Sequence, residues 1–241
     1  MLTQKHTYGI FFFTALAVLF PAIIENPKIV VANLFCMLAL RRIISLQSDK
    51  NDEKKILDAS LWIFVASFFY FWSLWFFVAL YLALIIKPIT YFRYYLIPVI
   101  AGLAVFLMAT AYTTITKDSF VWIPGWVEAP NFDFSVYQAP KTILVILLIL
   151  GIIVLTAFNR VWQIKSIPKK DRPNYLLIVQ VLVVAFLTCF FSPHKTTAEL
   201  LFLAVPSAII LSGYVEKLSN QWLTELILWI FILTPIVFIF V

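Results

Sequence analysis

One short loop carries the residue types and the spacing that come closest to a chemical site. His194 and Lys195 follow Ser192-Pro193, and Glu199 comes four residues after Lys195. Lys195 and Glu199 can therefore form an ion pair if a helix extends over both of them. Two cations beside a carboxylate could bind a pyrophosphate and position an acceptor, with His194 as general base because imidazole titrates near neutral pH. The simpler interpretation is a solvated turn in which the helix dipole favours Glu199 at a helix start.

A second candidate site is the adjacent pair Arg41 and Arg42, which ends an apolar stretch. Two neighbouring guanidinium groups could hold a lipid phosphate or a phosphosugar through paired hydrogen bonds. The simpler interpretation is a stop-transfer pair whose long side chains extend to the membrane surface. Asn33 lies about two turns earlier, and we expect its amide to hydrogen-bond a neighbouring helix rather than a substrate.

Acidic residues between the apolar stretches are candidates for acid/base catalysis. Glu25, Asp118, Glu128 and Asp133 show no spacing that is typical of a catalytic carboxylate pair. Glu25 is the only acid in its connector, so we take Glu25 and His194 as the candidate catalytic residues. The sequence has no P-loop, dinucleotide-binding glycine motif, HExxH or CxxC motif. We therefore expect no metal and no cofactor.

The amino-acid composition requires that most of the chain lies in lipid. Of the 241 residues, 63% are hydrophobic and 12% are charged, and the mean hydropathy is +0.99. A soluble domain needs more polar residues than this to cover its surface. Apolar runs such as residues 142–155 lack the alternation of a membrane β-strand, and helices satisfy every backbone group in hydrocarbon. The predicted fold class is therefore all-α, a polytopic bundle of transmembrane helices that forms a single domain over residues 1–241.

The sequence has eight apolar stretches, and most of them are close to the ~20 residues that span a bilayer. The stretch at residues 58–86 is too long, because its 29 residues at ~1.5 Å each give about 43 Å against a hydrocarbon core of ~30 Å. It is either one tilted helix or two short helices that fold back near Tyr70. The sequence thus predicts eight to nine membrane segments, nine with the short helix pair, which we favour. The stretches are residues 8–24, 29–46, 58–86, 94–115, 142–160, 174–191, 199–215 and 222–241.

The distribution of Lys and Arg favours the helix pair. With it, the N-terminus and four connectors share one side of the membrane and hold fourteen of the 18 Lys and Arg residues. Basic connectors stay in the cytoplasm, so we expect a cytoplasmic N-terminus, with residues 8–24 retained as an anchor. The net charge of +6 then needs no nucleic acid, and the expected partners are membrane lipids and other membrane-protein subunits. The four connectors are residues 41–57, 87–93, 160–173 and 216–221.

The connector at residues 116–141 is the longest segment on the opposite side. Its prolines and Gly125 argue against a continuous helix. Its Trp, Phe and Tyr side chains prefer the headgroup level of a bilayer. We therefore expect an extracytoplasmic aromatic loop that lies along the membrane surface.

Residues 33–67, together with residues 192–195 and 199–201, resemble an uncharacterised family of multi-pass inner-membrane proteins from Bacteroidota, described as a domain of unknown function. This resemblance implies a location in the inner membrane and no particular chemistry. At the level of the fold, the chain is also similar to the middle of the membrane glycosyltransferases that use polyprenyl-linked sugars, the GT-C type. Those enzymes keep a catalytic carboxylate in their first extracytoplasmic loop, where this chain has Glu25 and no second carboxylate nearby.

These observations leave three hypotheses for function. We expect an inner-membrane protein of unknown activity that serves cell-envelope assembly as a subunit or accessory factor, which requires an exposed groove of small or aromatic residues. The first alternative is an enzyme acting on lipid-linked sugars at the periplasmic face. It requires an outer cavity lined by Glu25, His194, Lys195 and Glu199. The second alternative is a transporter or flippase, which requires matching halves with broken helices at mid-membrane.

Overall fold

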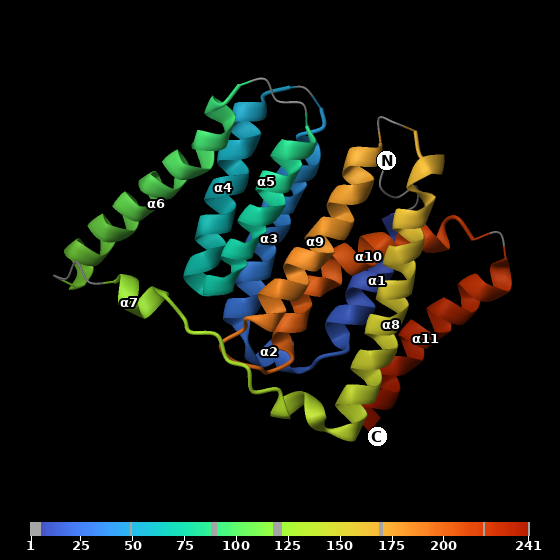
Figure 1. Ribbon diagram of the computed structural model, residues 1–241. Coiled ribbons are helices and arrows are strands. Elements are labelled where there is room, and N and C mark those ends of the chain that lie inside the picture. Colours follow the sequence, from blue (N-terminus) through green and yellow to red (C-terminus); the bar gives the residue numbers. More distant parts are fainter. Residues whose placement is uncertain are drawn as a thin grey trace.

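The computed structural model describes residues 6–48, 50–87, 91–117, 122–168, 171–218 and 220–240. Within them the fold is all-α, as the sequence predicts, with eleven α-helices, four short 3₁₀-helices and no strand (Figure 1). The α-helices are α1 (His6–Val18), α2 (Ala22–Glu25), α3 (Pro27–Ser45), α4 (Asp52–Phe69), α5 (Phe76–Ile86), α6 (Arg93–Lys117), α7 (Ile123–Trp126), α8 (Pro140–Trp162), α9 (Arg172–Phe190), α10 (Leu201–Val215) and α11 (Gln221–Phe240). The 3₁₀-helices are η1 (Phe71–Trp75), η2 (Ser135–Gln138), η3 (Gln163–Ser166) and η4 (Ala198–Leu200).

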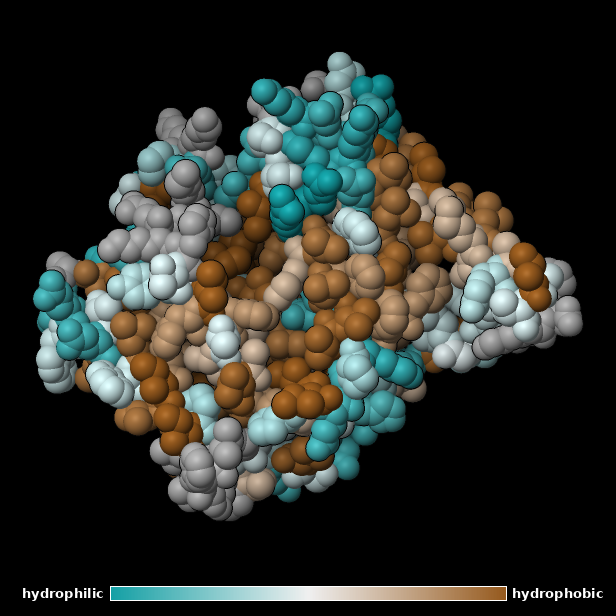
Figure 2. All heavy atoms as spheres, turned by 180° about the vertical axis from the view of Figure 1, so that it is seen from behind, coloured by the Kyte–Doolittle hydropathy of each residue, from teal (hydrophilic) through white to brown (hydrophobic). Residues whose placement is uncertain are grey.

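Four helical stretches in the described part of the chain are long and apolar enough to cross a membrane. They are Arg93–Thr116, Thr142–Ser166, Arg172–Phe190 and Ala198–Val215. The surface agrees with this assignment, because Figure 2 shows a broad hydrophobic belt across one face, with hydrophilic side chains gathered above and below it. Soluble monomers rarely expose apolar surface on this scale, so the belt indicates contact with lipid.

The stretch predicted as a helix pair at residues 58–86 is broken at Tyr70. α4 ends at Phe69, and Tyr70 takes an extended backbone conformation with φ −151° and ψ 104°. The 3₁₀-helix η1 turns the chain, and α5 returns alongside α4 (Figure 1). Tyr70 is held in the turn because its ring packs on Phe202, with centroids 5.1 Å apart, and its hydroxyl donates to the carbonyl of Thr188 at 3.4 Å. The predicted short helix pair is therefore confirmed.

The first apolar stretch, residues 8–24, is not helical throughout. α1 ends at Val18, a turn follows, and the short α2 precedes α3. Pro21 explains the break, because a proline ring disfavours helical backbone at the residue before it. α1 is therefore about 20 Å long, which is shorter than a typical membrane-spanning helix. The apolar stretch at residues 8–24 therefore consists of one helix, a turn at Pro21 and the short α2.

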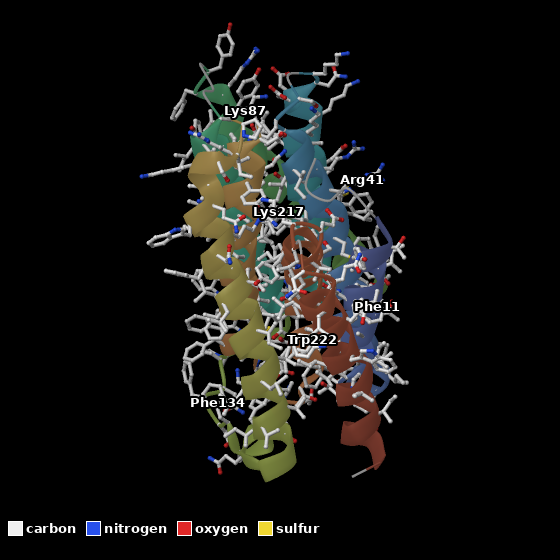
Figure 3. The ribbon with its side chains drawn as sticks, turned by 90° about the vertical axis from the view of Figure 1, so that its right-hand side faces the viewer. Phe11, Arg41, Lys87, Phe134, Lys217 and Trp222 are labelled. Carbon is white, nitrogen blue, oxygen red and sulfur yellow. The ribbon has the colours of Figure 1, made fainter. Side chains whose placement is uncertain are left out.

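The ends of the helices fall into two groups. The C-terminal ends of α3, α5 and α8 lie at one end of the bundle, together with the N-terminal ends of α4, α6 and α9 (Figure 1). α2, α7 and η2 lie at the opposite end. Figure 3 shows Lys87 and Arg41 toward the first end and Phe134 toward the second. The helix ends that flank the basic connectors 41–57 and 160–173 are thus grouped at one end of the molecule, which we call the basic end.

Ion pairs join the helices at the basic end. The Lys87 ammonium lies 2.7 Å from the Asp52 carboxylate and donates to the carbonyl of Leu46 at 2.6 Å. Because Lys87 is buried, these contacts fix the end of α5 between α3 and α4. Arg93 at the start of α6 lies 2.9 Å from Glu53 on α4, but both side chains are exposed, and such surface pairs contribute at most about 1 kcal/mol.

The helices differ in how far the bundle encloses them. α10 is central, since 78% of its apolar stretch is buried, whereas α6 is peripheral, with 17% buried. α6 leans away from α4 toward the end opposite the basic end (Figure 1). Gly102 allows a close approach in the first half of α6, because a Cβ atom there would lie 2.6 Å from Cζ of Phe64 on α4. α6 is therefore attached to α4 in its first half and separates from it in its second half.

Candidate functional site

The candidate loop between α9 and α10 folds around the buried ammonium group of Lys195. The last carbonyl groups of α9 have no partner within the helix. Lys195 donates to the carbonyls of Cys189 at 2.8 Å and Phe190 at 2.6 Å, where the helix dipole favours positive charge. Its ammonium also lies 4.9 Å from the centroid of the Phe134 ring. Burial lowers the pKa of Lys195 below its usual value, and the nearby Glu199 carboxylate partly opposes this shift.

Glu199 is fully buried in η4, just before α10. Its carboxylate accepts hydrogen bonds from the backbone N–H of Thr196 at 3.1 Å, from the Thr196 hydroxyl at 3.3 Å and from the Tyr137 hydroxyl. Tyr137 belongs to η2, so this carboxylate joins two segments that are distant in sequence. Burial and the neighbouring carboxylate raise the pKa of the Tyr137 hydroxyl well above its usual value, which keeps it a hydrogen-bond donor.

Lys195 and Glu199 do not form the ion pair that their spacing allows. Thr197 has a left-handed backbone conformation with φ 69°, so no helix extends over both residues. Lys195 therefore bonds to the end of α9, while Glu199 bonds to Thr196 and to η2. Internal hydrogen bonds satisfy both charged groups, as is usual for buried polar side chains. The two residues form a buried polar cluster with Thr196 and Tyr137, which we call the end cluster.

The chain between α6 and α8, predicted as an aromatic loop over residues 116–141, closes over the end cluster. Its residues 118–121 lie outside the described part of the chain. In the remainder, the backbone N–H of Asn131 donates to the carbonyl of Ser192 at 3.3 Å, and the indole N–H of Trp126 donates to the carbonyl of Ser67 at 2.9 Å. Only the short α7 and η2 interrupt these described loop residues. The loop thus crosses the end of the bundle (Figure 1).

The two candidate catalytic residues lie outside the end cluster. Glu25 and His194 are exposed. The backbone carbonyl of His194 accepts a hydrogen bond from the Ser192 hydroxyl at 2.8 Å. The main cavities of the described residues are lined by other side chains. The structure therefore brings Lys195 and Glu199 together and leaves Glu25 and His194 on the surface.

Arg41 and Arg42 lie near the C-terminal end of α3, at the basic end. The Arg42 guanidinium lies 3.0 Å from the Asp58 carboxylate on α4, and both side chains are partly exposed. Arg41 is exposed as well. Adjacent residues of a helix do not face each other. The two guanidinium groups therefore do not converge on a single position where both could bind one phosphate. Phosphate binding by Arg41 and Arg42 stays a prediction. Asn33, about two turns earlier in α3, is buried, as its place in the apolar stretch suggests.

A groove that the sequence does not predict lies between α4 and α6. Its volume is about 720 Å³, and it opens where α6 leans away from α4 (Figure 1). Val65 and Phe68 of α4 line one wall, and Trp122 and Trp126 border it at the end of the bundle. The Trp122 indole donates to the Thr110 hydroxyl of α6 at 3.1 Å and lies 5.5 Å from the Trp126 ring. The groove is therefore held open between α4 and α6 by aromatic side chains of the loop.

One face of α6 continues from the bundle into this groove. Ala101 and Val105 are buried, and Ala109 and Thr113 follow at the same spacing of four residues and are half-buried. Residues spaced by four share one face of a helix. Ala109 and Thr113 line the groove. This spacing of short side chains is visible in the sequence, and it is the signal by which the groove could have been found.

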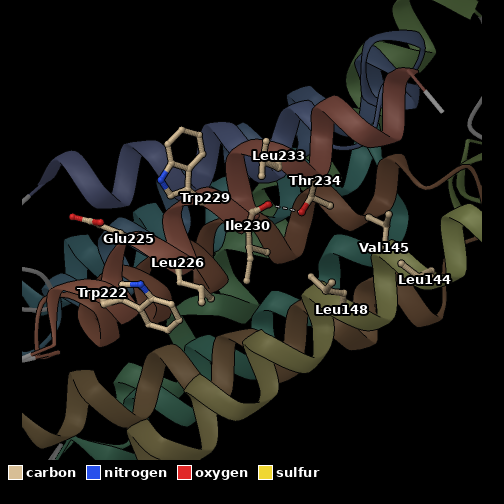
Figure 4. A pocket seen from close by; sticks show the side chains of 10 residues that line it. All are labelled: Leu144, Val145, Leu148, Trp222, Glu225, Leu226, Trp229, Ile230, Leu233 and Thr234. Atoms are coloured by element: carbon tan, nitrogen blue, oxygen red, sulfur yellow. Dashed lines mark hydrogen bonds between the residues drawn. The ribbon is translucent and has the colours of Figure 1, made fainter.

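A second groove, of about 610 Å³, lies between α8 and α11. Leu226 and Ile230 of α11 face Leu148 of α8, and Glu225 points away from α8 (Figure 4). Bulky branched and aromatic side chains line this groove, with no repeat of small residues. It therefore presents a general apolar surface of the kind that lipid chains cover.

The all-α fold, the four helices able to cross a bilayer and the hydrophobic belt define a helical membrane protein. The chain belongs to a family of unknown function (DUF6427), and the match covers residues 1–241. The resemblance to an uncharacterised family is thereby confirmed. No curated protein and no solved structure matches the chain, and the likeness to the GT-C glycosyltransferases stays a prediction.

Proposed function

We propose that the protein is a non-catalytic subunit of the bacterial inner membrane that serves cell-envelope assembly by binding a helix of a partner membrane protein between α4 and α6. The observation that carries the proposal is the stripe of short side chains on α6, which the bundle covers in one half and leaves open in the other. We further propose nine membrane segments, with the basic end in the cytoplasm. The segments are α1, α3, α4, α5, α6, α8, α9, α10 and α11.

The open half of the stripe favours a helix as the occupant. Membrane helices associate through close packing, and small residues at a spacing of four allow two backbones to approach. Ala109 and Thr113 continue the face through which Ala101 packs against the bundle. The Thr113 hydroxyl already donates to the carbonyls of Ala109 and Thr110 at 3.0 Å. Shape rather than polar bonding therefore makes this face suitable for a second helix.

The side chains beside the stripe suit a protein partner. Met108 and Tyr112 are 71% and 66% exposed and line the groove. A methionine side chain adapts to irregular apolar surfaces. Tyrosine and tryptophan offer large apolar contact areas with one polar group and are enriched in protein interfaces. The groove thus combines a face of short side chains with flexible and aromatic side chains along its borders.

The end cluster supports a structural role better than a catalytic one. A catalytic acid or base must come within hydrogen-bond distance of a substrate. Lys195 is 6% exposed and Glu199 is fully buried, and both are bonded to the protein itself. These bonds hold η2 and the loop between α9 and α10 together at the end of the bundle toward which the groove opens.

Photocrosslinking in native membranes tests the proposed docking face. A photoreactive amino acid in place of Ala109 is expected to give one adduct with a second membrane protein. In place of Leu107, which is 66% exposed and points away from the groove, the same probe is expected to give lipid adducts. Thr113→Trp fills the groove and is expected to lower the protein adduct at Ala109 about tenfold, the effect of roughly 1.4 kcal/mol of overpacking.

Two outcomes would contradict this proposal. The first is the same pattern of lipid adducts at Ala109 and Leu107, because a lipid chain does not distinguish the two faces. The second is a protein adduct that Thr113→Trp leaves unchanged. Equal amounts of each variant in the membrane fraction serve as the control for insertion.

A further inference from the structure

A separate group of charges lies at the basic end, where α8, α9 and the end of α10 meet. Arg160 is near the C-terminal end of α8 and is 4% exposed. Tyr175 is buried in the first turns of α9, and Lys217 follows α10 as an exposed side chain (Figure 3). All three residues line one narrow crevice.

Two cations are held around the single ring of Tyr175. The guanidinium carbon of Arg160 lies 3.7 Å from the centroid of the ring, and its Nε–H donates to the carbonyl of Tyr175 at 3.3 Å. The Lys217 ammonium donates to the Tyr175 hydroxyl at 2.7 Å and lies 4.7 Å from the same centroid. An aromatic ring attracts each cation, but two like charges on one ring repel each other. This arrangement therefore favours a negative group nearby.

The Arg160 guanidinium carries hydrogen-bond donors that no described residue accepts. Its Nη1 and Nη2 atoms are both buried, and neither has a hydrogen-bond partner among the described residues. In the described part of the chain, no carboxylate forms an ion pair with Arg160 or with Lys217. Buried charges in proteins are normally paired with an opposite charge and fully hydrogen-bonded. The unpaired nitrogens of Arg160 and the neighbouring Lys217 therefore favour an anion as their partner in this crevice.

The geometry points to a phosphate-binding site formed by Arg160 and Lys217, with Tyr175 holding both side chains in place. The two terminal nitrogens of a guanidinium group form a planar fork that matches two oxygens of a phosphate, and an ammonium group supplies a third donor. The phosphate is either the headgroup of a membrane lipid or a free phosphate from the cytoplasmic side. The crevice has room for about one water molecule, so the exposed Lys217 side chain must move aside for the ligand to enter.

Binding to the purified full chain in a neutral detergent tests this site, with phosphatidylglycerol and inorganic phosphate as separate probes. Native mass spectrometry measures lipid retention, and a thermal shift measures phosphate binding. Arg160→Met is expected to weaken binding about tenfold to a hundredfold, the usual value of hydrogen bonds to a charged group. The matched control is Arg172→Met, which removes a charge at the same end whose guanidinium is already bonded to the carbonyls of Ile167 and Lys165. This control is expected to bind within about twofold of the wild type.

Lys217→Gln keeps the test decisive if Arg160→Met fails to fold, because Lys217 is exposed. It is expected to weaken binding about tenfold. Loss of phosphatidylglycerol alone in these variants assigns the site to a lipid headgroup, and loss of inorganic phosphate binding assigns it to a free phosphate. Unchanged binding of both probes in Arg160→Met and Lys217→Gln overturns the proposal. An equal loss in Arg172→Met also overturns it, because general charge would then explain the binding.

Discussion

Glu199→Leu is expected to lower the free energy of unfolding by about 3 kcal/mol or more. The change removes the acceptor of three hydrogen bonds, two from Thr196 and one from Tyr137. Those half-buried donors lose their acceptor, and the buried Lys195 ammonium loses the negative charge beside it. Thermal unfolding of the purified protein in detergent measures the loss.

Glu25→Leu is the matched control, since Glu25 is an exposed carboxylate at the same end of the molecule. Its effect is expected to stay within about 0.5 kcal/mol. Tyr137→Phe removes one of the three bonds, so it is expected to lie between the control and Glu199→Leu. If Glu199→Leu unfolds like the wild type while the cells lose the protein's function, the carboxylate acts in chemistry and the structural role is wrong.

Gly102→Leu is expected to lower the free energy of unfolding by about 2 kcal/mol, as overpacking of a close contact does. The Cβ atom alone would lie 2.6 Å from Cζ and 3.0 Å from Cε2 of Phe64. The Phe64 ring has limited room to move, because it also packs against the Phe77 ring, with centroids 4.7 Å apart. α6 must then move away from α4, and the photocrosslinked protein adduct at Ala109 is expected to fall as well.

Gly151→Leu on α8 supplies the control for this substitution. No atom lies within 4 Å of a Cβ built at Gly151, so the side chain extends into free space. Leucine favours helix over glycine by roughly 0.5–1 kcal/mol, and this variant is expected to be as stable as the wild type or slightly more so. Equal destabilisation by the two substitutions would show that Gly102 does not set the contact between α6 and α4.

The helical class and the break near Tyr70 could be predicted from the sequence because both follow from local quantities. Hydrophobic length against bilayer thickness indicates either a steep tilt or a break within residues 58–86, and the distribution of basic residues favours the break. The end of α1 at Val18 falls within the apolar stretch at residues 8–24, and Pro21 is the visible signal for it.

The end cluster could be predicted only in part. The sequence places Lys195 and Glu199 in one loop, but their pairing depends on a helix that the left-handed Thr197 excludes. Tyr137 completes the cluster from another segment, and no local sequence pattern predicts such a long-range contact. The buried donors of Arg160 were missed for a similar reason, because a basic residue at a helix end resembles an ordinary topology signal until its neighbours are known.

Accessibility of single introduced cysteines is the most direct measurement of the claim that the basic end lies in the cytoplasm. Lys54→Cys and Lys165→Cys probe that end, and Asn131→Cys and His194→Cys probe the opposite end; all four positions are exposed. The native Cys36 and Cys189 are buried and give little background. A membrane-impermeant maleimide is expected to label Asn131→Cys and His194→Cys in intact cells, and Lys54→Cys and Lys165→Cys only after the inner membrane is opened. Labelling of Lys54→Cys or of Lys165→Cys in intact cells would contradict the account.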